Sequence, residues 1–207
     1  MMNLAGGGEG MWSSAVRSAI MRAHTIAEWL AEPEARRLEL VDGEFVEKAA
    51  PDITHGLSQA RLITAVSSPF NRPAGHGGAP GGWWIVSEVD VRLGQDGFRP
   101  DVCGWRRERV TVLPRARPVE LVPDWICEVL SESNRANDTV RKLRRYHRAG
   151  VGYYWLLDPI AGVLSVFRHQ SEGYLNVLTG ERPELVRAAP FEAVELRVAE
   201  LLGEDPE

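Results

Sequence analysis

Two carboxylates and one lysine have types and positions that could act together on a phosphate. Asp101 follows a proline in the stretch FRPDVCGW, Glu128 lies inside the stretch WICEVLSES, and Lys142 comes fourteen residues later. Two carboxylates on neighbouring strands suit Mg²⁺, a hard cation that binds through one or two carboxylates and keeps several waters. A lysine nearby supplies a compact positive charge for a phosphate or an activated water. The set could therefore support metal-assisted phosphodiester hydrolysis.

Glu128 raises the question of what compensates its charge. Side chains alternate along a strand, so one face carries Ile126, Glu128 and Leu130 and the other carries Trp125, Cys127 and Val129. An ionised carboxylate between aliphatic neighbours is costly to bury unless a cation or several donors meet it. We expect a metal ion with Lys142 behind it. The structural alternative is that Glu128 and Asp101 pair with arginines.

Two further residues are candidates for the same site. Glu39 alternates with leucines in LELVDGE, where ordinary surface exposure is also reasonable. His55 heads an expected helix, where helix capping or surface placement is the alternative to a site role. Lys142 itself could pair with Asp138, four residues earlier on the same helix.

A basic segment surrounds Lys142. Residues 135–148 hold six Arg or Lys against one Asp, so the segment carries +5 within a chain of net charge −5. As a helix, it could follow a nucleic-acid backbone with Arg141, Arg144, Arg145 and Arg148, or these could be a solvated face. The apolar residues predict that Val140, Leu143 and Tyr146 or His147 face inward.

The elements that must position these residues can be read from local patterns. Helices are expected at 25–31, 55–68, about 137–149 (ended by Gly150) and near 194–202. Asp42-Gly43 predicts a hairpin within 36–49, and 71–82 reads as a loop. Strands are expected at 84–93, 98–105, 125–133, 152–159, 163–169 and 174–178, with a short one at 110–113. Strand, helix and strand over 125–158 predict a βαβ-type crossover in a mixed sheet.

Composition fits one ordinary globular domain over 25–207 with a flexible tail at 1–24. No apolar run approaches the roughly 20 residues of a membrane span, and the tail has no apolar core of a secretory signal, so we expect a cytoplasmic protein. The sequence contains no Cys-x-x-Cys motif, so a zinc site is not expected. Strand parity places Cys103 and Cys127 on opposite faces if Asp101 and Glu128 share a site, which excludes a disulfide between them.

Several motifs in order resemble a known group of enzymes. RPD, EVLS, ND-x-x-x-K-x-x-x-Y and GVGYYWLLDP are similar to the PD-(D/E)XK nuclease superfamily, and more narrowly to bacterial restriction-endonuclease-like proteins called the Uma-two family. LELVDGEF and THG match that family's opening segments. The resemblance covers roughly residues 25–202.

The resemblance implies an α/β fold, a restriction-endonuclease-like mixed curved sheet flanked by helices. It assigns Mg²⁺, with Mn²⁺ as a substitute, to Asp101, Glu128 and the backbone carbonyl of Val129. The superfamily lysine usually stands two residues after the second acid, where this chain has Leu130. The family with this pattern places its lysine on the next helix, and the resemblance therefore assigns that role to Lys142. Glu39 matches an acidic residue from the N-terminal part of such sites. The implied substrate is DNA, and cleavage of both strands would need a homodimer.

Two alternatives remain open at this point. The chain could be a nucleic-acid-binding or regulatory module that keeps the fold without turnover. It could also be a structural protein in which the carboxylates merely pair with arginines.

Overall fold

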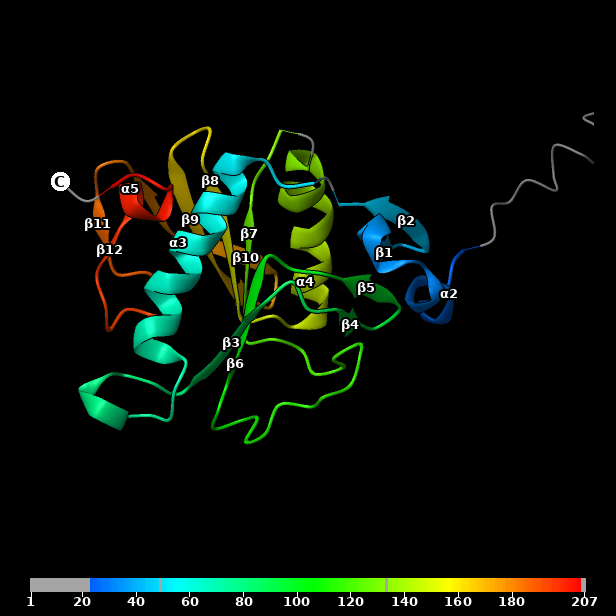
Figure 1. Cartoon of the computed structure of the whole chain (residues 1–207), viewed down its shortest axis with the longest axis horizontal. Coiled ribbons are helices and arrows are strands. Elements are labelled where there is room, and N and C mark those ends of the chain that lie inside the picture. The colour runs from blue at the N-terminus through cyan, green and yellow to red at the C-terminus, as the bar shows by residue number, and fades with distance from the viewer. Residues whose placement is uncertain (1–22, 49, 133, 206–207) are drawn as a thin grey trace, which may run out of the picture.

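A six-stranded mixed sheet forms the centre of the computed structural model, which describes residues 23–48, 50–132 and 134–205 (Figure 1). Its strand order is β10-β9-β8-β7-β6-β3. The bounds are β3 (Trp83–Ser87), β6 (Val102–Arg106), β7 (Trp125–Val129), β8 (Tyr153–Asp158), β9 (Val163–Gln170) and β10 (Gly173–Glu181). β7 and β8 pair in parallel, while the other neighbours are antiparallel. The predicted mixed sheet with a crossover from β7 to β8 is confirmed.

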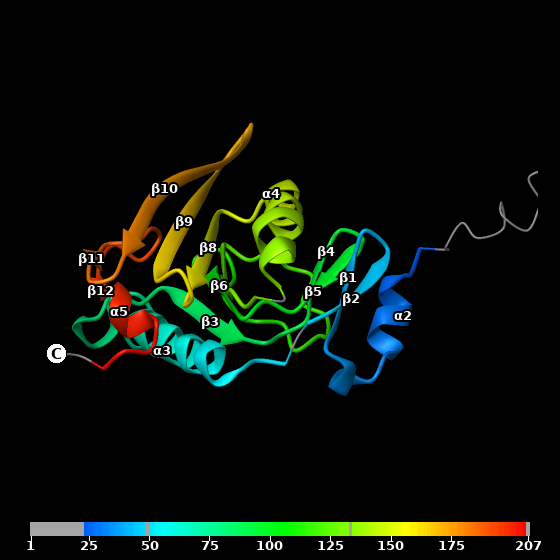
Figure 2. The same cartoon turned by 90° about the horizontal axis from the view of Figure 1, so that it is seen from above.

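Helices cover both faces of this sheet (Figure 2). α3 (Ile53–Phe70) and α5 (Val198–Leu201) pack on the face that carries Trp125, Cys127 and Val129. The helix formed by the basic segment packs on the face that carries Ile126 and Leu130. The alternation predicted along β7 is therefore correct, and Glu128 points toward the basic helix.

The two cysteines lie on opposite faces of the sheet. Cys103 packs with the cluster on the side of the basic helix, and Cys127 packs on the side of α3. Both thiols are buried and free. This agrees with the prediction from strand parity.

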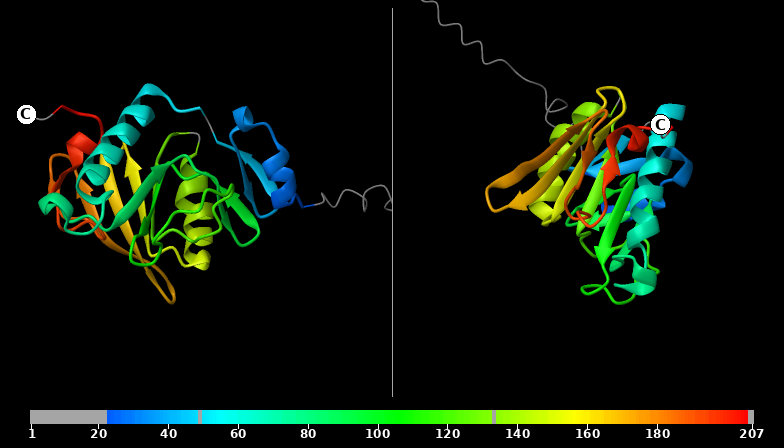
Figure 3. Two further views of the ribbon diagram at one scale, coloured as in Figure 1. Left: turned by 60° about the horizontal axis from the view of Figure 1, so that its bottom comes forward. Right: turned by 90° about the vertical axis from the view of Figure 1, so that its left-hand side faces the viewer.

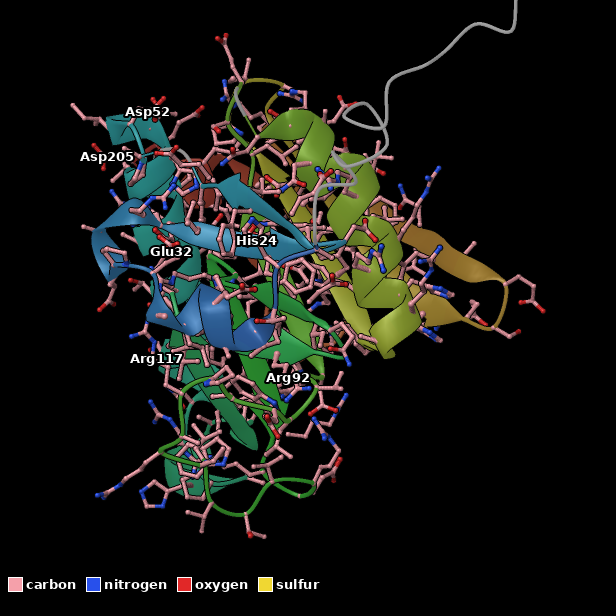
Figure 4. All side chains as sticks on the ribbon, turned by 90° about the vertical axis from the view of Figure 1, so that its right-hand side faces the viewer. His24, Glu32, Asp52, Arg92, Arg117 and Asp205 are labelled. Atoms are coloured by element: carbon pink, nitrogen blue, oxygen red, sulfur yellow. The ribbon has the colours of Figure 1, made fainter. Side chains whose placement is uncertain are left out.

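A smaller sheet stands beside the large one, with the order β2-β1-β5-β4. Its strands are β1 (Leu38–Val41), β2 (Glu44–Glu47), β4 (Val91–Leu93) and β5 (Asp96–Phe98). The predicted hairpin at Asp42-Gly43 joins β1 to β2, and the predicted capping box of Thr25 and Glu28 starts α2 (Ile26–Ala31). Trp29 of α2 donates from Nε1 to the carbonyl of Leu38 at 2.6 Å. In Figure 4, α2 and this hairpin lie in front of the large sheet.

Two expected strands are each broken into two, which corrects the predictions for 84–93 and 98–105. The first becomes β3 and β4, and Glu88 between them has a left-handed backbone with φ 54°. The second becomes β5 and β6, separated by Arg99, Pro100 and Asp101. Pro100 has no N–H for a strand ladder. Both breaks carry the chain from one sheet to the other, and Asp101 consequently lies in a bend before β6 rather than inside a strand.

The basic helix also differs in detail from the prediction. It begins as a π-helical segment, η3 (Asn137–Lys142), continues as α4 (Leu143–Ala149) and ends at Gly150 with φ 82°, as expected. Its buried residues are Asp138, Lys142 and Tyr146. The prediction that Val140 faces inward is wrong, since its exposed fraction is 46%. Asp138, Lys142 and Tyr146 are spaced four residues apart and therefore share one inward face of the helix, and that face is polar.

The remaining elements lie at the edges of the molecule. Short 3-10 turns occur at η1 (Glu34–Arg36) and η2 (His76–Gly78), the latter in the expected loop. No strand forms at 110–113, and Val119 instead bridges to Val91. β9 and β10 extend as a long hairpin away from the body (Figure 3). β11 (Leu185–Val186) and β12 (Leu196–Arg197) form a small ribbon that sequence patterns missed, and α5 is shorter than the helix expected at 194–202.

Two predictions concern the chain outside these elements. The expected flexible tail, 1–24, lies outside the described residues except for Ala23 and His24. Within the described ranges, the structure contains no helix with the length and apolar character of a membrane span.

The contact between α2 and β5 gives a test of the packing that holds the small sheet. A Cβ on Gly97 would lie 2.4 Å from Cε3 of the buried Trp29 ring. Gly97→Ala should lower the free energy of unfolding in urea by about 1–3 kcal/mol because the core is overpacked. Gly56→Ala is the control, since Gly56 lies in α3 with nothing within 4 Å of its added Cβ. Helix propensity predicts a gain of up to about 1 kcal/mol there. Equal effects of the two substitutions would contradict this packing.

Candidate active site

A cluster of charged side chains is buried where the two sheets meet the basic helix. None of its residues is more than 6% exposed, and its members are Glu39, Lys48, His55, Asp101, Glu128, Asp138 and Lys142. They come from β1, the end of β2, the first turn of α3, the bend before β6, β7 and η3. The C-terminal end of β7 and the first turns of α3 and η3 all lie at one end of the large sheet (top of Figure 1). The structure thus brings together Glu39, His55, Asp101, Glu128 and Lys142, all of which were candidates from the sequence.

Asp101 is held by contacts on both carboxylate oxygens. Its Oδ2 accepts the backbone N–H of Val129 at 2.7 Å and lies 3.2 Å from Nε2 of His55. Its Oδ1 lies 2.6 Å from Nζ of Lys48. Although burial alone would raise the pKa of Asp101, Lys48 and His55 hold it below its ordinary value. Asp101 is therefore an ionised carboxylate in the folded protein.

Glu128 is met by a lysine and a tyrosine rather than by an arginine. Its Oε1 lies 3.1 Å from Nζ of Lys142 and accepts the hydroxyl of Tyr146 at 2.7 Å. Its Oε2 accepts the backbone N–H of Asp101 at 3.4 Å, which ties Glu128 to the backbone of the Asp101 segment. Burial raises the pKa of Glu128 to about 8, and the charges of Asp101 and Asp138 add to this effect while Lys142 opposes it.

Lys142 lies at the centre of three carboxylates. Its Nζ is 3.0 Å from Glu39 Oε2, 3.1 Å from Glu128 Oε1 and 3.1 Å from Asp138 Oδ1. These three contacts match the three N–H donors of an ammonium group. Burial opposes the charge of Lys142, but the three carboxylates raise its pKa well above the ordinary value. The predicted pairing with Asp138 is present, and Glu39 is fixed further by the backbone N–H of Arg99 at 3.0 Å.

Lys48 is the buried residue that sequence reasoning missed. Besides Asp101, its Nζ donates to the carbonyl of Arg99 at 2.7 Å and lies 3.3 Å from Glu88 Oε1. Glu88 also accepts from Gln59 of α3 at 3.2 Å. The sequence around Lys48, which follows the strand EFVE, contains no pattern that predicts burial. Its partner Asp101 lies just before β6 and is distant in the sequence.

The cluster carries more negative than positive charge. Four carboxylates, Glu39, Asp101, Glu128 and Asp138, face the two ammonium groups of Lys48 and Lys142. Burial also raises the pKa of Asp138 to about 6, with Lys142 opposing and Glu39 adding to the rise. Such an excess favours either protonation of a carboxylate or binding of a further cation.

The donor set fits a divalent oxygen-seeking cation at Asp101 and Glu128. Both are buried carboxylates, the backbone N–H of Asp101 bonds to Glu128, and a doubly charged ion would offset the negative excess. No ready-made group of three or more His, Cys, Asp or Glu ligands occurs among the described residues. That is compatible with Mg²⁺, which binds through one or two carboxylates and completes its shell with water and substrate phosphate. Val129 contributes its N–H to the cluster, and the role of its carbonyl stays a prediction.

The four arginines expected to bind nucleic acid divide into two pairs. Arg141 lies 3.2 Å from Glu44, and Arg145 contacts Asp42 and, at 3.5 Å, Asp96. These contacts tie the basic helix to the small sheet. Arg144 and Arg148 are exposed and form no ion pair with the described part of the chain.

The chain as a whole is similar to a known protein family and to a solved structure. Residues 24–199 match the Uma2 (Uma-two) family, described as putative restriction endonucleases. The chain belongs to this family. It is also similar to a solved structure described as a putative nuclease from Anabaena variabilis, with a TM-score of 0.69 and 21% identity. The match covers 86% of this chain and 97% of that one, which confirms the restriction-endonuclease-like fold. No curated protein matches the chain.

The raised pKa of Glu128 predicts an unusual dependence of stability on pH without metal. The native state holds a proton on Glu128 up to about pH 8, whereas the ordinary value is 4.5. The folded protein therefore binds more protons than the unfolded chain, and its stability should fall as the pH rises from 6 to 8. The slope is at most about 1.4 kcal/mol per pH unit. Urea unfolding in a chelator measures it.

Glu128→Gln should flatten that slope, since the amide does not titrate. Glu120→Gln is the matched control, because Glu120 is exposed in an ion pair with Arg92. A wild-type slope that survives in Glu128→Gln would show that the pH dependence comes from another group.

Proposed function

We propose that this protein is a metal-dependent endonuclease that hydrolyses phosphodiester bonds of DNA. One observation carries the proposal: Asp101 and Glu128 are joined in a buried cluster whose carboxylates outnumber its lysines. Membership of a family described as restriction endonucleases supports the same reaction class. The two free thiols fit the cytoplasmic location expected from the sequence.

Asp101 and Glu128 would hold Mg²⁺ or Mn²⁺, with the backbone carbonyl of Val129 as a further ligand. A divalent ion supplies a water of lowered pKa and positive charge beside the phosphate. The protein's part is to fix the ligands: Val129 N–H and His55 orient Asp101, while Lys142 and Tyr146 orient Glu128. Glu39 assists directly or through water, and Lys142 adds positive charge that stabilises the transition state.

The basic helix would guide the DNA backbone to this site. Arg144 and Arg148 are free to contact phosphates, whereas Arg141 and Arg145 are already paired with Glu44 and Asp42. Cleavage of both strands would require two such sites, so we propose a homodimer as the active form.

An inactive nucleic-acid-binding module on the same fold is the second candidate. The observation in its favour is that every carboxylate of the cluster already contacts a lysine. A protein that balances its own site in this way could bind nucleic acid without cleaving it.

Metal binding and cleavage separate the two candidates. The wild type should bind Mn²⁺ in a calorimetric titration and cleave duplex DNA in Mg²⁺ or Mn²⁺. Asp101→Asn and Glu128→Gln should abolish metal binding and slow cleavage by about 100-fold or more, because each removes a ligand charge. Glu120→Gln should behave as the wild type. DNA binding without metal, together with no cleavage of duplex DNA, single-stranded DNA or RNA, would establish the inactive module.

The division of the arginines predicts unequal roles in DNA binding. Arg144→Ala combined with Arg148→Ala should weaken duplex DNA binding and reduce the slope of log K against log salt by about 1–2, since up to two phosphate contacts are lost. Fluorescence anisotropy at several salt concentrations measures this. Arg187→Ala, on a distant surface where Arg187 pairs with Glu195, is the control. An unchanged slope in the double variant would place the DNA on another surface.

A further inference from the structure

The two lysines of the cluster are bound in different ways. Lys142 has three carboxylate partners at 3.0–3.1 Å and is 2% exposed. If one carboxylate turned to a metal ion, two would still hold it. Lys142 is therefore fixed in place by its ion pairs with Glu39, Glu128 and Asp138.

Lys48 depends much more on a single carboxylate. Its short contacts are with Asp101 Oδ1 at 2.6 Å and with the backbone carbonyl of Arg99 at 2.7 Å. Its contacts with the two oxygens of Glu88 are longer, at 3.3 and 3.4 Å. Losing Asp101 would leave the ammonium group with the carbonyl of Arg99 and the two longer contacts with Glu88.

The oxygen that Lys48 contacts is the one a metal ion would need. Asp101 Oδ2 already accepts the N–H of Val129 and lies beside His55. Within the described residues, Oδ1 makes no hydrogen bond of good geometry, and its ion-pair contact is with Lys48. A divalent ion on Oδ1 and the ammonium group of Lys48 would repel each other at this distance. The two cations thus compete for one oxygen.

The surroundings of Lys48 lead from the buried cluster toward solvent. The side chain of Glu88 is 30% exposed and forms an ion pair with Arg37. Both residues have a left-handed backbone, with φ 54° at Glu88 and φ 48° at Arg37. Non-glycine residues hold such a backbone only where the surrounding structure imposes it, often at functional sites. The N–H of Glu88 donates to the carbonyl of Pro100, directly beside Asp101. Lys48 therefore lies between the proposed metal ligand and a partly exposed anionic edge.

We propose that Lys48 is a second lysine of the nuclease site, which neutralises Asp101 before the metal ion binds and contacts the substrate phosphate afterwards. The inference rests on the proposed function. It gives the lysines separate tasks: Lys142 positions the carboxylates, and Lys48 is the exchangeable cation. The metal ion replaces Lys48 as the partner of Asp101, and the phosphate replaces Asp101 as the partner of Lys48. No buried ion is therefore left unpaired.

Metal binding in Lys48 variants tests the first half without a substrate. Lys48→Gln should bind Mn²⁺ at least tenfold more tightly than the wild type in calorimetry, because the competing cation is gone. It should also have a lower unfolding temperature without metal, and Mn²⁺ should raise that temperature more than it does in the wild type. A lysine with a merely structural role would leave the metal-induced rise unchanged.

Lys48→Met and Arg109→Met complete the set. The methionine variant should show the same tighter binding with a larger loss of metal-free stability, since the amide of the glutamine variant can still bond to Asp101. Arg109 pairs with Asp124 outside the cluster, so Arg109→Met should lower stability equally with and without Mn²⁺. Equal or weaker Mn²⁺ binding by both Lys48 variants would overturn the inference. If the wild type still bound Mn²⁺ through Asp101, the proposed metal site would remain valid and only the role of Lys48 would be refuted. If none of the proteins bound Mn²⁺, both the metal site and the role of Lys48 would be refuted.

DNA binding tests the second half. Without metal, Lys48→Gln and the wild type should bind duplex DNA equally, because Lys48 is engaged with Asp101. With Ca²⁺ as a probe ion, the wild type should bind about three- to tenfold more tightly than Lys48→Gln. An equal effect of Ca²⁺ on the two proteins, including no effect on either, would overturn the phosphate contact.

Discussion

Four buried carboxylates and two buried lysines share one space between the two sheets, and the surrounding structure is built to hold their charges there. Buried ions are tolerated only when they are paired and hydrogen-bonded. Here each carboxylate contacts a lysine, but the cluster as a whole has four carboxylates for two lysines. The remaining negative charge makes this region the place where an additional cation gains most. Structure and proposed chemistry therefore depend on the same imbalance.

Irregular backbone is what brings the charges together. Glu88 and the Arg99–Asp101 segment interrupt two strands that would otherwise be continuous, and each interruption moves the chain between the sheets. The N–H of Arg99 and the carbonyl of the same residue then bind Glu39 and Lys48. On the other side, the spacing of four residues places Asp138 and Lys142 of η3 and Tyr146 of α4 on one inward face.

Local patterns predicted the elements better than the breaks between them. The hairpin at Asp42-Gly43, the capping box at Thr25 and the stop at Gly150 each depend on a few adjacent residues, and all are present. Apolar alternation from Trp84 to Leu93 predicted one strand because Glu88 carries no local mark of a left-handed backbone. Val140 was expected inside because apolar residues were assumed to face the core, whereas the inward face of this helix carries Asp138, Lys142 and Tyr146.

Resemblance and spacing brought the main candidate residues into one list, and the fold places them in one cluster. Lys48 could not be found in this way, since its role depends on Asp101, which is distant in sequence and reaches it only through the exchange between sheets. Glu39 was ambiguous for a related reason: alternation with Leu38 and Leu40 is compatible with exposure, whereas all three side chains are buried. One face of β1 is buried by α2 and the other by the charged cluster. The sequence of the strand does not predict either contact.

The central claim is that the negative excess of this cluster is met by a divalent ion at Asp101 and Glu128. Anomalous diffraction from crystals grown with Mn²⁺ tests it most directly. One strong manganese peak is expected within bonding distance of both carboxylates, with Nζ of Lys48 moved away from Asp101. A cluster without manganese and with the contact between Lys48 and Asp101 intact would contradict it.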